Sequence, residues 1–115
     1  MWISVLVFAV AALVGLTMAV AAFKGRLPPV SSAVVHGLLA ATGLVLLIIA
    51  VFMRGVTGAP KWALGFFLLA ALGGFVLALG FHARKKNLPP GFVAGHAVIA
   101  VIGFLLLFGG ALGLL

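Results

Sequence analysis

Two histidines, His36 and His96, stand at corresponding places in two similar stretches of this chain. Each follows a Leu-Pro-Pro sequence, and each is followed seven residues later by a glycine, Gly43 or Gly103. Imidazole nitrogens are common metal ligands and also form hydrogen bonds. An ionisable side chain that recurs symmetrically in apolar surroundings indicates that both imidazoles face a common object, such as a metal centre.

Composition indicates the solvent in which these histidines must lie. Hydrophobic residues make up 67% of the chain and charged residues 6%, which predicts an integral membrane protein whose main partner is the lipid bilayer. The chain has no Asp, Glu or Cys, so disulfides and thiolate ligands are excluded and the formal charge of +7 has no internal counterpart. The seven Lys and Arg occupy short connections between apolar segments, which favours a role in membrane orientation and argues against nucleic acid binding.

Four apolar stretches are long enough to cross a hydrocarbon core of about 30 Å, which takes about 20 helical residues. Pro-, Gly- and Lys/Arg-containing connections separate them. We therefore expect an all-α membrane protein, a four-helix transmembrane bundle. The expected helices cover Trp2 to Phe23, Val30 to Met53, Trp62 to His82 and Gly91 to Leu114.

The basic residues predict the orientation of these helices. The first and third connections hold five of the seven basic side chains, and the second holds only Arg54 and Lys61. Because cytoplasmic loops carry the excess of Lys and Arg, the first and third loops are predicted to be cytoplasmic and both termini to lie outside. We expect the chain in a bacterial inner membrane, with its first helix retained because that apolar run is too long for a typical signal peptide.

A sequence repeat predicts how the two histidines are placed relative to each other. Within a single transmembrane domain, residues 1–115, we predict two helical-hairpin repeats, residues 1–55 and 60–115. The match includes Ala11 to Leu16 against Ala70 to Phe75. Since each repeat has two helices, the hairpins enter the membrane in the same direction and are related by a pseudo-twofold axis along the membrane normal. Such an axis places His36 and His96 at equal depth on opposite sides of itself.

Both histidines lie six or seven residues beyond a proline, roughly 10 Å into their helices at 1.5 Å per residue. A neutral imidazole in hydrocarbon needs partners for its donor and its acceptor. One haem b, ligated by His36 and His96, would use one nitrogen of each ring. The other nitrogens could donate to a carbonyl or to the hydroxyl of Ser31, Ser32 or Thr42.

Small and basic residues extend this expected site. Four glycines near the histidines would let a flat macrocycle approach the backbone, and four cations in the first and third loops would pair with the haem propionates. The glycines are Gly37, Gly43, Gly95 and Gly103, and the cations are Lys24, Arg26, Arg84 and Lys85.

Two histidines from different helices of a small four-helix membrane bundle resemble the axial ligands of membrane b-type cytochromes. The resemblance rests on His36, His96 and their neighbouring glycines, and it implies one haem that carries electrons, with a quinone or a redox protein as partner. Dihaem members of that family need a second ligand pair, which this chain lacks. An electron carrier is therefore favoured over a catalyst.

Two other interpretations stay open for the histidine pair. The rings could only form hydrogen bonds between helices of a non-catalytic membrane subunit, or they could form a site for a quinone or another small ligand. His82 has no counterpart in the first hairpin and is expected to be an interfacial residue whose polar tip reaches water. The absence of carboxylates argues against acid-coupled transport and hydrolysis. A homo-oligomer and a subunit of a larger complex are both compatible with the sequence.

Overall fold

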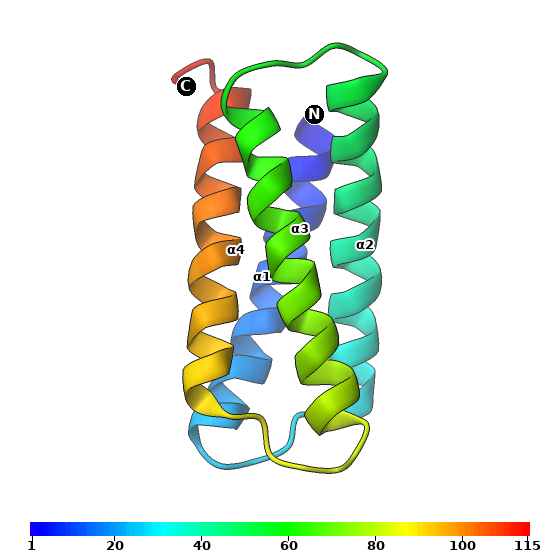
Figure 1. Cartoon of the computed structure of the whole chain (residues 1–115), viewed down its shortest axis with the longest axis vertical. Coiled ribbons are helices and arrows are strands. Elements are labelled where there is room, and N and C mark those ends of the chain that lie inside the picture. Colours follow the sequence, from blue (N-terminus) through cyan, green and yellow to red (C-terminus); the bar gives the residue numbers. More distant parts are fainter.

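The computed structural model describes residues 1–115 as four long helices without a strand (Figure 1). The helices are α1 (Trp2–Phe23), α2 (Val30–Phe52), α3 (Ala59–Leu77) and α4 (Pro90–Ala111). Helix α3 continues into η1 (Ala78–His82), one turn of π-helix. Together these elements form a bundle that measures 42 × 21 × 19 Å.

Two helix ends differ from the sequence expectation by three residues, and local backbone chemistry explains both. Helix α3 begins at Ala59, before the expected Trp62, because Pro60 fits the first turn, where a helix needs no N–H donor. Helix α4 ends at Ala111, before the expected Leu114, because Gly113 adopts a positive φ of 74° that stops the helix.

All four helical segments are long and apolar enough to span a membrane, with α3 and η1 together forming the third span. Large apolar side chains such as Leu13, Leu38, Leu72 and Leu105 are exposed on the outside of the bundle. An apolar exterior of this kind is stable in lipid and not in water. The predicted class, a four-helix transmembrane bundle, is therefore confirmed.

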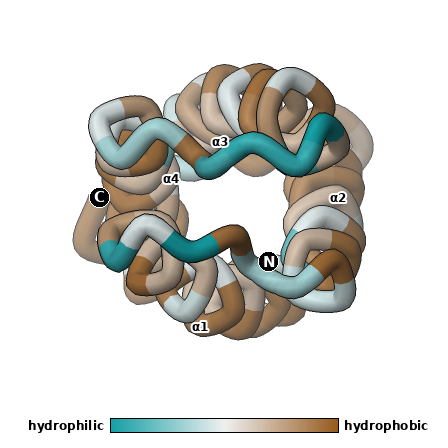
Figure 2. The backbone as a smooth tube through the Cα atoms, turned by 90° about the horizontal axis from the view of Figure 1, so that it is seen from below, coloured by the Kyte–Doolittle hydropathy of each residue, from teal (hydrophilic) through white to brown (hydrophobic).

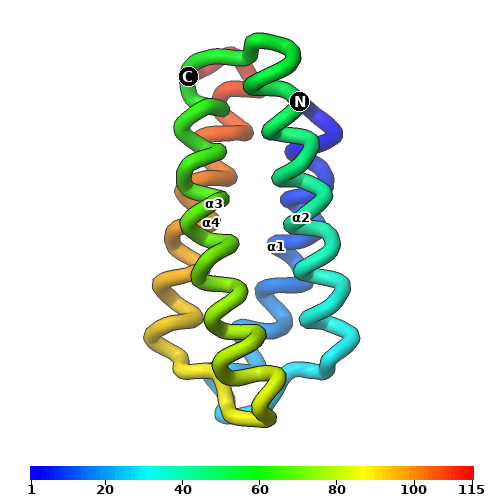
Figure 3. Tube along the Cα trace, turned by 45° about the vertical axis from the view of Figure 1, so that its right-hand side comes forward, coloured from blue at the N-terminus to red at the C-terminus, as the bar shows by residue number.

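The helices stand at the corners of a square, with α1 diagonal to α3 and α2 diagonal to α4 (Figure 2). Packing is closest within two hairpins, α1 with α2 and α3 with α4, and the hairpins lie side by side (Figure 3). Both chain termini and the α2–α3 loop lie at one end, here called the terminal end. The α1–α2 and α3–α4 loops lie at the other, here called the loop end.

Buried apolar side chains form one cluster near each end of the bundle. The cluster at the terminal end has eight buried residues and is centred on Phe8 and Phe67, whose rings stack with centroids 3.8 Å apart. The cluster at the loop end has four, Ala22, Leu77, Leu88 and Val93. Phe8 and Phe67 occupy corresponding positions in the two hairpins, so the stacked pair lies where the hairpins meet.

Both helices that lead into the loop end stop in the same way. Gly25 after α1 and Lys85 after η1 have positive φ angles of 69° and 55°. In each case the following residue donates its N–H to a carbonyl five positions back, from Arg26 to Ala21 and from Lys86 to Phe81. This is the bonding pattern of a left-handed helix cap. Glycine adopts it freely, whereas Lys85 does so against a steric penalty.

Candidate functional site

His36 and His96 are brought together between the hairpins. Each is the seventh residue of its helix, α2 or α4, and these two helices are diagonal partners in the bundle (Figure 2). The ring centroids lie 6.3 Å apart, with the ring planes inclined at 75°. Both side chains are half-buried. The pair occupies the level between the two apolar clusters, which fits the equal depth expected from the repeat.

The hydrogen bond of His36 determines which nitrogen remains free. Its Nδ1 lies 2.8 Å from the carbonyl oxygen of Ala11 in α1. Because a carbonyl only accepts hydrogen bonds, Nδ1 carries the proton and donates it. In the neutral ring, Nε2 then keeps its lone pair. A backbone hydrogen bond that orients an imidazole in this way is the usual arrangement around histidine metal ligands.

His96 has the equivalent surroundings without the equivalent hydrogen bond. Its Nδ1 is buried and has no hydrogen-bond partner of good geometry. The acceptor within reach is the backbone of Ala70 in α3, which corresponds to Ala11 in the repeat. A buried imidazole nitrogen without a partner is unfavourable in an apolar interior. The two histidines thus occupy corresponding positions, but only His36 forms a hydrogen bond to the facing helix.

Glycines on α1 and α3 allow the rings to reach these carbonyls. A Cβ atom at Gly15 would lie 2.9 Å from Cε1 of His36, closer than real Cβ atoms approach. At Gly74 it would lie 3.4 Å from Cε1 of His96, and at Gly73 3.5 Å from Nδ1. In the sequence this stretch is recognisable only as part of the repeat. The available signal was the position of Gly15 and Gly74, each four residues after the alanine that faces the ring.

The four glycines expected to border a macrocycle have other environments. Gly37 and Gly95 are exposed on the outside of the bundle, with no atom near the position of a Cβ. Gly43 is buried against the ring of Phe8, and Gly103 against Phe67 and the Cβ of Phe66. A role of these positions beside a macrocycle stays a prediction. Gly43 and Gly103 make room for phenylalanine.

The expected hydroxyl partners of the imidazoles are also elsewhere. Thr42 donates to the carbonyl of Leu38 in its own helix, with an O–O distance of 2.8 Å. Ser31 and Ser32 line an open groove of about 420 Å³ between α1 and α2, together with Thr17. This groove opens on the outside of one hairpin. The hydroxyls therefore do not support the histidine pair.

His82 is not the water-facing residue that the sequence suggested. It is buried, and its Nε2 lies 2.7 Å from the carbonyl oxygen of Pro28, to which it donates. The bond connects the end of the third span to the loop before α2. The sequence expectation failed because the π-helical turn could not be read from the apolar pattern.

The four expected cations, Lys24, Arg26, Arg84 and Lys85, are exposed at the loop end, the end nearer the histidines. Figure 2, viewed from this end, shows the hydrophilic colour concentrated in the two loops. The chain offers these cations no Asp or Glu partner. The end that carries the histidines is thus also the end with the stronger positive charge. Its assignment to the cytoplasm stays a prediction.

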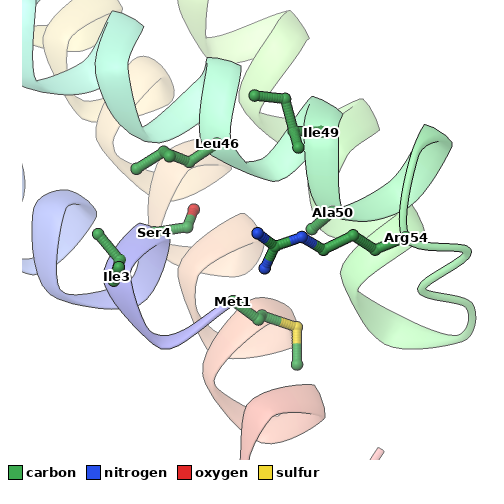
Figure 4. A pocket seen from close by; sticks show the side chains of 7 residues that line it. All are labelled: Met1, Ile3, Ser4, Leu46, Ile49, Ala50 and Arg54. Atoms are coloured by element: carbon green, nitrogen blue, oxygen red, sulfur yellow. The ribbon is translucent and has the colours of Figure 1, made fainter.

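A separate cavity lies at the terminal end, away from the histidines. It has a volume of about 70 Å³ and is lined mainly by apolar side chains, with Ser4 and Arg54 as its polar members. The guanidinium of Arg54 extends over the start of α1 toward Ser4 and Met1 (Figure 4). Ser4 already donates to the carbonyl of Gly43. The cavity is too small for a cofactor of haem size and adds no donor to the histidine pair.

The separation of the two rings is compatible with a metal bound between them. A metal bonded at about 2 Å to one nitrogen of each ring requires ring centres roughly 6 Å apart, once the distance from nitrogen to ring centre is added. The observed separation is 6.3 Å. No group of three or more His, Cys, Asp or Glu side chains is placed to hold a metal ion. A pair of this kind suits a metal whose remaining ligands come from a cofactor, as in haem.

Fold and site together define a class of protein, a four-helix transmembrane bundle with one pair of facing histidines between two hairpins. Comparisons with protein-family models, with curated proteins and with solved structures found no match. The functional argument therefore rests on the residues of this chain.

Proposed function

We propose that this protein binds one haem b between His36 and His96 and carries electrons within the membrane. The observation that supports the proposal is the facing pair of rings, 6.3 Å apart on diagonal helices, with Nδ1 of His36 committed to a backbone carbonyl. That commitment leaves Nε2 as the nitrogen available for iron. A bound haem would supply one-electron redox chemistry that no side chain of this chain provides.

The residues around the pair have separate roles in this proposal. His36 and His96 would be the ligands, and the hydrogen bond to the Ala11 carbonyl holds the ring of His36 in orientation. Gly15 and Gly74 keep the space beside the rings free of side chains. With both histidines as ligands, a bound haem would have no position open for a substrate. This favours an electron carrier over a catalyst.

The loop-end cations give the proposal an electrostatic element. The propionates of haem are anionic, and the chain has no acid of its own. Lys24 and Arg26 on one loop and Arg84 and Lys85 on the other are the available partners, because long side chains reach from the interface into the membrane. The redox partner would be a quinone or another protein, and the chain could work as a homo-oligomer or within a larger complex.

A second function is favoured by one specific observation. The bond from His36 to Ala11 already joins α2 to α1 without any cofactor. Hydrogen bonds between membrane helices are commonly structural. In that case the histidines only hold the helices of a non-catalytic subunit together.

Visible absorption spectra distinguish the two functions. The purified protein, expressed with ample haem, is measured oxidised and then reduced with dithionite. Haem ligation predicts the Soret and α bands of low-spin iron, and His36→Ala or His96→Ala abolishes or strongly alters them. His82→Gln is the matched control, because it removes the third histidine and keeps a donor. A colourless parent protein refutes haem ligation and leaves the structural function.

A further inference from the structure

One histidine, His82, takes no part in the proposed ligation, yet it is buried and joins the two hairpins. Its Nε2 donates to the carbonyl of Pro28 over 2.7 Å, between residues 54 positions apart. Pro28 lies just before α2, the helix that carries His36. His82 ends the third span, which leads through a short loop into α4 and His96. The bond therefore connects the segment before α2, which carries His36, to the span before α4, which carries His96.

The π-helical turn explains how His82 reaches the other hairpin. In η1 the chain takes one residue more per turn than an α-helix, which rotates the following residues by about 100° around the axis. The corresponding end of α1 has no such turn, and the corresponding residue, Phe23, is exposed. π-helical turns occur frequently at functional positions. Here the turn directs an imidazole at the neighbouring hairpin.

The contacts between the hairpins are fewer at the loop end. There, four buried apolar residues and two hydrogen bonds join them, the second from Asn87 Nδ2 to the carbonyl of Gly25 over 3.1 Å. The terminal end has eight buried residues and the stacked pair of Phe8 and Phe67. The loop end therefore has fewer packing contacts to lose when the hairpins separate, and its two hydrogen bonds carry a larger share of the contact there.

We propose that His82 is a positioning residue, a clasp that closes the loop end and thereby holds His36 and His96 at their separation. The part that concerns a ligand between the histidines rests on the proposed function. A ligand as large as haem enters and leaves between the hairpins, so the clasp slows both steps. The histidines lie two helical turns from the clasp, close enough for a change in hairpin spacing to reach them.

The clasp itself is tested without any cofactor. The chain has no Cys, so Lys24→Cys and Lys86→Cys introduce a unique pair of exposed label sites, one in each loop. Spin labels at these sites report the short distance between the loops by dipolar broadening of frozen-solution electron paramagnetic resonance spectra, in the full-length protein expressed without haem. His82→Leu is expected to lengthen and broaden the distance distribution. An unchanged distribution would overturn the clasp.

Two further variants separate the hydrogen bond from the shape of the side chain. Gln places an amide donor near the position of Nε2, so His82→Gln should restore the narrow distribution. Asn is polar but too short to reach Pro28, so His82→Asn should resemble His82→Leu. Circular dichroism verifies that each variant stays helical. If Asn restores the distribution as well as Gln does, the bond to Pro28 is not the cause.

The effect on a bound ligand is measured as haem transfer to apomyoglobin. His82→Leu should release haem about tenfold faster than the parent, while His82→Gln stays close to it, as expected when a group that orients a ligand is lost. Equal release rates refute control of ligand exchange by the clasp. A parent protein that binds no haem refutes the proposed function alone, because the spin-label distances still decide whether His82 closes the loop end.

Discussion

Replacing Gly15 by alanine tests whether the fit of His36 against α1 matters. The added Cβ would lie 2.9 Å from Cε1 of the His36 ring and 3.2 Å from Nδ1. The ring must therefore move, and the bond from Nδ1 to Ala11 is strained or lost. Gly74→Ala is the matched variant in the other hairpin, where the added Cβ lies 3.4 Å from Cε1 of His96. That distance is ordinary contact.

The expected size of the effect follows from three contributions. Overpacking costs about 1–3 kcal/mol and loss of a membrane hydrogen bond about 0.6 kcal/mol, while alanine gains about 0.5–1 kcal/mol over glycine in a helix. We expect Gly15→Ala to lower the free energy of unfolding by about 1–3 kcal/mol. Gly37→Ala, with open space around the new atom, should leave it unchanged or raise it slightly.

Unfolding of the detergent-solubilised protein by increasing SDS measures these differences, with helicity as the signal. If haem is bound, Gly15→Ala should also weaken its retention by about 10- to 100-fold, as for loss of other groups that orient metal ligands. Gly74→Ala should have a smaller effect on both quantities. Should Gly15→Ala behave like Gly37→Ala in stability and in retention, the close fit of the His36 ring against α1 would be disproved.

Three other changes have definite expected outcomes. Phe67→Ala removes half of the stacked pair with Phe8 and should lower the free energy of unfolding by about 3–5 kcal/mol, as large core truncations do in soluble proteins. Ser4→Ala removes a buried donor to Gly43 and should cost about 0.6 kcal/mol in the same SDS assay, with a loss above about 2 kcal/mol contradicting this explanation. Lys85→Gly relieves a non-glycine residue at φ 55° and should stabilise the protein by about 1 kcal/mol, and a destabilised variant would refute the strain.

The class of fold could be predicted because hydrophobicity and length determine it almost alone in a membrane. Each span needs about 20 apolar residues, and only helices satisfy their own backbone there. Helix ends were harder to predict, because they depend on single residues. Pro60 is a residue type common in loops but also suits a first helical turn, and Gly113 ends a helix within a run that is still apolar.

The repeat allowed only one property of the candidate site to be predicted, the common depth of the two histidines. Symmetry brought His36 and His96 to one level, but it did not reveal what faces each ring. Ala11 contributes a backbone carbonyl, and every residue type has one, so no sequence pattern marks it. The packing of Gly43 against Phe8 and of Gly103 against Phe67 could not be predicted, because these phenylalanines lie on other helices.

The departures from symmetry have a physical basis in the third span. Between corresponding points of the two hairpins the spacing is 59 residues at Phe8 and Phe67, and 61 at Pro28 and Pro89. The second hairpin therefore contains extra residues before its Pro-Pro pair, and η1 accommodates one of them as a π-helical turn. That turn brings His82 to Pro28, where it forms a hydrogen bond. The corresponding residue of the first hairpin, Phe23, has no side-chain donor, so the bond has no symmetric counterpart. Two identical hairpins would contact each other through equivalent surfaces. The insertion makes the two surfaces at the loop end different, so that His82 of the second hairpin meets Pro28 of the first.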